Sequence, residues 1–216
     1  MTRPFPQARP AFRLPWWWPA CLCLLFCAAP ATANGWTQRH HVIPAWSLGV
    51  PGANAHRYTP AFGFGGLSTA LRIRVHPRLS VNASHTWQRF RSETTGTARL
   101  AEMTITSPQQ RRQDMHALGA ALDVDLPGRS TLLPWFGLGT FALYSQRHSD
   151  QFAPPGLRIQ RTRELWQWAF APRVGLLIMM RRLPLSLTAT SHIAPPFGDL
   201  PLTVLTLFQV GLAIPI

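Results

Sequence analysis

Lysine is absent from this sequence of 216 residues, and acidic residues are few: all 21 basic residues are arginine, against 8 aspartates and glutamates. Arginine is always charged, and its planar guanidinium binds phosphate or carboxylate through paired hydrogen bonds. The composition therefore suits polyanionic partners, although a GC-rich genome would also favour arginine over lysine.

Cysteine is also scarce, and all of it lies near the start of the chain, at Cys21, Cys23 and Cys27. The same segment has the three parts of a signal peptide: a basic start without acidic residues, an apolar run over Leu14–Ala29, and the small-residue pattern Ala31-Thr32-Ala33. We therefore expect residues 1–33 to be cleaved before Asn34, which leaves a mature chain without disulfides or a thiol nucleophile. An uncleaved anchor is the alternative, although two prolines interrupt the run, which is short for a span of about 20 residues.

Beyond residue 33 the sequence contains no apolar run long enough for a membrane-spanning helix. Instead, bulky apolar side chains occupy every second position of several segments, which is typical of β-strands with one apolar and one polar face. Leu79, Val81 and Ala83, for example, alternate with Ser80 and Asn82. The segments with this pattern are 41–50 (the weakest), 67–75, 79–88, 118–126, 132–139, 166–180, 183–193 and 202–216. They predict an all-β protein with about eight strands, whose lengths suit a tilted membrane-crossing strand of about 9–11 residues.

Two features favour a transmembrane barrel, with apolar faces toward lipid, over a soluble periplasmic β-barrel that binds an apolar ligand. Short turns are expected at His76-Pro77, Pro127-Gly128 and Arg181-Arg182, and long loops over Arg91–Gln113 and Gln146–Arg161; outer-membrane barrels have this asymmetry. Aromatic residues near the long loops would form an interfacial girdle, and these are Trp87, Phe90, Tyr144, Trp166 and Trp168.

The stretches 77–81 (PRLSV), 134–141 (PWFGLGTF) and 208–216 (FQVGLAIPI) resemble those of small eight-stranded outer-membrane barrels of the OmpA and OmpW type. The last is similar to the terminal signal read by the barrel-assembly machinery, but it ends in Ile216 rather than Phe or Tyr and contains Pro215. The resemblance implies a closed antiparallel transmembrane β-barrel over residues 34–216, located in the cell outer membrane. It also implies outer-membrane lipid as the surroundings and the assembly machinery as a partner during biogenesis.

A group of charged residues falls on the polar strand faces near the short-turn end, where it would point into the lumen. Its members are Arg72, Arg74, Asp123, Asp125 and Arg173. An eight-stranded barrel is just wide enough to be filled by side chains, and buried charges need partners. We therefore expect a salt-bridged plug in the lumen, with a narrow ion path as the alternative.

The sequence shows no convincing catalytic or metal site. The run His148-Ser149-Asp150 contains the residue types of a hydrolytic triad, but adjacent strand residues point to opposite sides. It also lacks the His-x-Ser-Asn pattern of the lipid A deacylases, whose architecture this chain resembles. His40-His41 fails as a metal site for the same geometric reason. We expect no catalysis, no cofactor and no metal, and no nucleic-acid partner for an exported barrel.

Arginines are in excess on the long-loop side, which would face lipopolysaccharide phosphates. Those expected to contact lipopolysaccharide are Arg89, Arg91, Arg111, Arg112, Arg158, Arg161 and Arg163. A solvated loop with local ion pairs is the alternative. The leading hypothesis is a non-enzymatic, porin-like outer-membrane protein with a structural or surface-interaction role. The alternatives are a conduit of the OmpW kind, for small solutes or hydrophobic molecules, and a lipid A-modifying enzyme.

Overall fold

The computed structural model describes residues 40–60, 62–100, 103–126, 131–153, 157–180, 184–198 and 200–216. The expected signal peptide and two of the expected short turns, Pro127-Gly128 and Arg181-Arg182, lie outside the described residues. Within the described ranges, no helix has the length and apolar character needed to cross a membrane.

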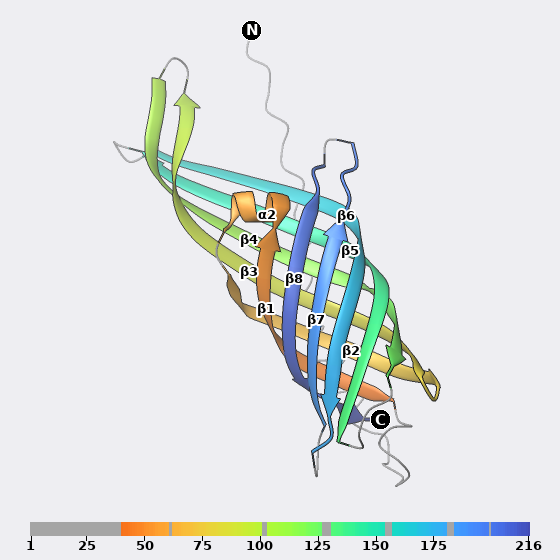
Figure 1. Cartoon of the computed structure of the whole chain (residues 1–216). Coiled ribbons are helices and arrows are strands. Elements are labelled where there is room, and N and C mark those ends of the chain that lie inside the picture. The colour runs from red at the N-terminus through yellow and green to blue at the C-terminus, as the bar shows by residue number, and fades with distance from the viewer. Residues whose placement is uncertain are drawn as a thin grey trace. The chain divides into compact units, whose positions relative to one another are not determined.

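Almost all of the described chain is β-strand, and one short helix follows the first strand (Figure 1). The elements are β1 (His41–Gly52), α2 (Ala53–Tyr58), β2 (Gly63–His76), β3 (Leu79–Leu100), β4 (Met103–Asp125), β5 (Leu132–Ala153), β6 (Leu157–Ile178), β7 (Leu185–Ala194), β8 (Thr203–Leu212) and β9 (Ile214–Pro215). Each strand from β1 to β7 pairs antiparallel with the next one along the chain, and β8 pairs back with β1. The two-residue β9 pairs with the start of β1. The predicted all-β fold of eight antiparallel strands in a ring is confirmed.

Side chains alternate between the lumen and the outer surface along these strands. On β6, Trp168 is 75% exposed whereas the adjacent Ala169 is 3% exposed. The same alternation leaves many other large apolar side chains on the outside, among them Leu67, Leu118, Phe136, Leu138, Val174 and Phe208. A protein in water rarely exposes so much apolar surface, whereas a transmembrane barrel presents it to lipid. The predicted assignment of apolar faces to the outside agrees with this arrangement.

The strands β3 to β6 are much longer than predicted, at 22 or 23 residues each. The expected long loops are wrong, because strand pairing continues from Arg91–Arg112 to Leu100–Met103. It likewise continues from Gln146–Glu164 to Ala153–Leu157. These extensions carry polar side chains on both faces and therefore show no apolar alternation, which is the signal that predicts a strand.

The lumen contains apolar as well as polar side chains. Phe90, which was expected in the aromatic girdle, is completely buried with Met115, Leu205 and Leu207. Its position on β3 differs by two from that of the buried Gln88, so its side chain points inward, where the alternation of β3 requires it to be. The girdle prediction is wrong for Phe90, because an inward side chain near a strand end does not reach the membrane interface.

Candidate functional site

A row of aromatic rings crosses the outer surface of four neighbouring strands, at positions that are in register. Its members are Trp87, His116, Tyr144 and Trp166. The ring centroids of His116 and Tyr144 are 5.9 Å apart, and those of Tyr144 and Trp166 are 4.7 Å apart. Aromatic side chains of this kind collect at the interface between hydrocarbon and water.

The residues on either side of this aromatic row differ in polarity. Toward the short turns the outward residues are mostly apolar, as at Leu118 and Trp168. In the other direction the next outward positions are polar, at Arg89, Asp114, Gln146 and Glu164. We therefore assign one membrane boundary to the aromatic row, and the parts of β3 to β6 beyond it project from the membrane as a four-stranded sheet.

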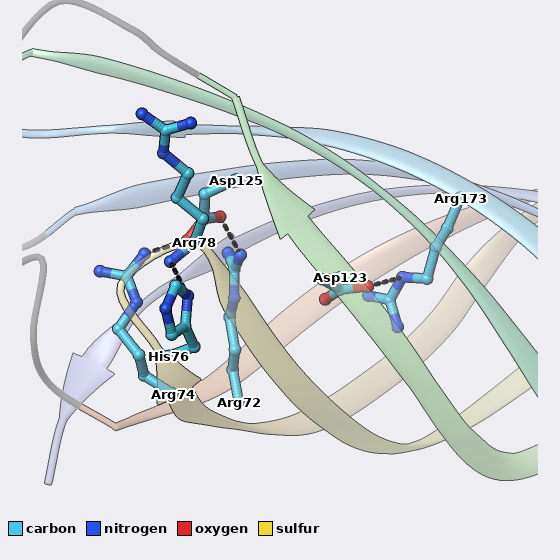
Figure 2. A network of polar contacts seen from close by, with 7 residues as sticks. All are labelled: Arg72, Arg74, His76, Arg78, Asp123, Asp125 and Arg173. Carbon is cyan, nitrogen blue, oxygen red and sulfur yellow. Dashed lines mark hydrogen bonds and ion pairs between the residues drawn. The ribbon is translucent and has the colours of Figure 1, made fainter.

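Five charged side chains meet in the lumen near the short-turn end (Figure 2). Arg72 and Arg74, at successive inward positions of β2, both form ion pairs with Asp125 of β4. One inward position away on β4, Asp123 pairs with Arg173 of β6, with 3.5 Å between Oδ1 and Nε. The side chains of Asp123 and Arg173 are 0% and 5% exposed. The structure thus brings together the five residues expected in the lumen, and their role as a plug stays a prediction.

Trp135 of β5 is a buried part of the same layer, and its role there was not predicted from the sequence. The guanidinium carbons of Arg72 and Arg173 lie 5.1 Å and 4.9 Å from the centre of its ring, within the range of cation–π attraction. Gly175 of β6 makes room for the indole, because a Cβ at position 175 would overlap the ring. A glycine opposite a tryptophan was the signal in the sequence that could have indicated this packing.

A cavity of about 10 Å³ lies beside the charged layer, lined by Arg72, Asn82, Trp135 and Arg173 among others. Such a volume holds about one water molecule. A solute larger than water therefore does not fit into this cavity.

The seven arginines expected to contact lipopolysaccharide divide between the two faces of the projecting sheet. Those on the outer face are Arg89, Arg91, Arg112 and Arg158, and those on the inner face are Arg111, Arg161 and Arg163. On the outer face, Arg89 and Arg112 both bind Asp114, at 2.6 and 2.8 Å. Arg158 binds Asp150 at 3.1 Å. A loop has no regular alternation of faces, so the loop prediction for this region could not reveal this division.

The sequence matches no protein-family model and no curated protein. Among solved structures, the crystal structure of Neisserial surface protein A (NspA) is similar: it is 10% identical, with a TM-score of 0.52, over 82% of this chain and 97% of that chain. The N-terminal β-barrel domain of Pseudomonas aeruginosa OprF is 7% identical, with a TM-score of 0.43, over 82% and 98% of the two chains. Ail of Yersinia pestis is 8% identical, with a TM-score of 0.40, over 82% and 97%.

The chain has the fold of a small eight-stranded outer-membrane β-barrel. This conclusion rests on the likeness to NspA and on the closed ring of strands, and it confirms the predicted resemblance at the level of fold. The expected location in the outer membrane agrees with this fold and with the apolar outer surface of the barrel.

The histidines of the barrel are spread over both of its faces. Ser149 points to the inner face of β5 and is 8% exposed, whereas His148 and Asp150 point outward, so these three residues do not form a triad. His192 is buried in the lumen, with its ring 4.7 Å from that of Phe141. Within the described ranges, no three His, Cys, Asp or Glu side chains gather in a group that could hold a metal ion.

Helix α2, which was not predicted, follows the end of β1 (Figure 1), and residues at its C-terminal end reach β4 and β5 of the projecting sheet. The Tyr58 hydroxyl donates to the backbone oxygen of His148 at 2.9 Å, and the Thr59 hydroxyl donates to Gln113 Oε1 at 3.0 Å. The guanidinium carbons of Arg111 and Arg147 lie 5.5 and 5.0 Å from the centre of the Tyr58 ring. Burial raises the pKa of Tyr58, and the two positive charges oppose this shift.

Proposed function

We propose that this outer-membrane barrel has a structural or surface-interaction role, and that its outward arginines bind the phosphates of the surrounding lipopolysaccharide. The observation that carries the proposal is a local cluster of arginines on β3 and β4, just beyond the aromatic row. Arg89, Arg91 and Arg112 lie there together, and Asp114 is the carboxylate that pairs with two of them.

The placement of Arg91 opposite Arg112 needs a physical reason. The two residues are direct cross-strand partners on the outer face, and like charges in that arrangement destabilise a sheet. Arg91 is exposed, and no ion pair of it occurs among the described residues. An anion between the two guanidiniums would turn the repulsion into charge-assisted hydrogen bonds.

The distance of these arginines from the aromatic row also suits contact with lipid headgroups. Arg91 lies four positions beyond Trp87 on β3, which is about 13 Å along the strand and less along the membrane normal because strands tilt. Arg158 lies eight positions from Trp166, or about 26 Å along β6, and already pairs with Asp150. Arg89, Arg91 and Arg112 are therefore the better candidates for phosphate contact, and Arg158 suits the saccharide region farther out.

The test compares two double variants of the whole protein in vesicles with and without lipopolysaccharide. Arg91→Gln with Arg112→Gln removes outward charge, and Arg161→Gln with Arg163→Gln removes the same charge from the inner face. Lipopolysaccharide should raise the thermal unfolding midpoint of the wild type and of the inner-face variant, and should raise that of the outer-face variant much less. An equal response of the two variants would contradict the proposal, since it would mean that net charge rather than placement decides.

A lipid A-modifying activity and a conduit are weaker candidates. The small cavity beside the charged layer gives the conduit no support, and His148-Ser149-Asp150 has no triad geometry. The lipid A mass spectrum of expressing cells, which we expect to be unchanged, tests the first of them.

A further inference from the structure

We propose a second anion site, on the inner face of the projecting sheet, where Arg111, Arg147, Arg161 and Arg163 bind a phosphate or sulfate group of a soluble ligand. The site faces away from the surrounding lipid. It is therefore independent of the proposed contact with lipopolysaccharide, and neither proposal rests on the other.

Strand register places the four arginines in two adjacent rows. Gln113, Arg147 and Arg163 are direct partners across β4, β5 and β6. Two positions farther from the membrane, Arg111, Ser149 and Arg161 form the next inward row. Neighbouring strands lie about 4.8 Å apart, so the four guanidinium groups can converge on one oxyanion with Ser149 between them.

Among the residues that the structure describes, no acidic side chain balances this charge on the inner face. The described acidic residues of the projecting sheet all have outward positions, and they are Glu93, Asp114, Asp150 and Glu164. Among the described residues, the ion pairs of this sheet accordingly involve outward arginines: Arg89, Arg112 and Arg158. The inner arginines are thus left to stack on a ring, to bind neutral groups or to bind a ligand.

Arg147 is the clearest sign of a ligand site. It is only 8% exposed, and its Nε has no hydrogen-bond partner among the described residues. The hydroxyl of Ser92, which is the β3 partner of Arg111, is also buried without a hydrogen-bond partner. A buried guanidinium with an unsatisfied N–H group is costly, and burial together with the charge of Arg163 lowers the pKa of Arg147. A bound oxyanion would satisfy these donors.

Helix α2 determines the side from which the ligand reaches the site. Tyr58 packs its ring against Arg111 and Arg147 and is held by the bond to the His148 carbonyl oxygen. Arg161 and Arg163 remain exposed. The ligand therefore approaches these two side chains from the medium beyond the membrane, and Tyr58 holds Arg111 and Arg147 in place beneath it.

The experiment titrates the purified whole protein, in zwitterionic detergent, with pyrophosphate and with a sulfated disaccharide, followed by calorimetry. The inner variant is Arg147→Gln with Arg163→Gln, and the matched control is Arg57→Gln with Arg78→Gln, which removes the same charge from two exposed positions outside both proposed sites. Because Arg147 is buried, the exposed Arg163→Gln single variant is included in case the double variant does not fold. The shift in gel mobility on heating checks the fold of each protein.

We expect saturable binding to the wild type and to the control, with at least a tenfold loss of affinity in the inner double variant and a smaller loss in Arg163→Gln. The comparison of pyrophosphate with the sulfated disaccharide then distinguishes a phosphorylated from a sulfated ligand. Absence of binding of either anion to the wild type at moderate salt would overturn the proposal. An equal loss in the inner variant and in the control would overturn it as well, because diffuse surface charge would then account for the binding.

Discussion

The ion pair between Asp123 and Arg173 offers the sharpest test of how the lumen is stabilised. Replacing Asp123 by Asn keeps the shape of the side chain but leaves the Arg173 guanidinium buried with its nearest countercharge removed. Arginine does not lose its proton in a protein, so this charge cannot be neutralised by titration. Asp123→Asn should therefore destabilise the barrel strongly.

The geometry sets the size of the effect. At the observed 3.5 Å and an effective dielectric constant of about 20, the attraction between the two charges is roughly 5 kcal/mol. Desolvation offsets much of this attraction in the intact pair, but breaking a buried pair on one side typically costs about 3–5 kcal/mol. We expect Asp123→Asn to lower the free energy of unfolding by about that amount. Adding Arg173→Gln should restore part of the loss, with a coupling energy of about 1 kcal/mol or more.

The measurement is urea unfolding in lipid vesicles, followed by tryptophan fluorescence and by gel mobility with and without heating. Asp150→Asn is the matched control, because its ion pair with Arg158 is exposed, with side-chain exposures of 33% and 53%. Its cost should stay below about 1 kcal/mol. If Asp123→Asn cost no more than this control, or if the double variant showed no coupling, the buried pair would not stabilise the lumen and the reasoning would be refuted.

Three further predictions concern packing in the lumen, the titration of Tyr58 and conductance. Gly175→Ala should lower the free energy of unfolding by about 1–3 kcal/mol in the same urea assay, because the new Cβ would overlap Trp135. Gly65→Ala is the control and should be nearly neutral, because the space around position 65 is open. In a Tyr144→Phe variant only Tyr58 remains of the two tyrosines, and its absorbance at 295 nm should titrate with a midpoint above pH 10. The pKa of Tyr58 in the folded protein is raised above 10.0, so the stability that the neutral phenol contributes is fully present below pH 10 and is lost as the pH rises through the folded pKa. A titration midpoint below pH 10 would contradict the burial of Tyr58. The wild-type barrel should show no steady conductance in planar bilayers, and a stable open level would mean that the charged layer moves aside.

Hydrophobic alternation was sufficient to predict the barrel itself. Along a segment such as 79–88 it determines which side chains face lipid and which face the lumen, because the side-chain period of a strand is two whatever the tertiary contacts. It also brought Arg72, Arg74, Asp123, Asp125 and Arg173 to one end of the lumen. The same rule, applied without the girdle argument, would have placed Phe90 inside.

The projecting sheet and helix α2 could not be predicted in this way. The extensions of β3 to β6 are polar on both faces, so their strand structure depends on pairing with neighbours, and pairing is not visible in a single segment. Helix α2 has only six residues, too few to be stable alone, and it is held by contacts of Tyr58 and Thr59 with β4 and β5.

The sequence by itself determined the number of ring strands, their inward and outward faces, and the presence of charge in the lumen, because these follow from local periodicity and from the need to close a sheet in lipid. Only the tertiary structure decided which charges pair, since the choice of Asp125 for Arg72 and Arg74, and of Asp123 for Arg173, depends on strand register. Register also divided the arginines of the projecting sheet between its outer and its inner face. In both cases the reason is that the partners are far apart in the chain and meet only when the ring closes.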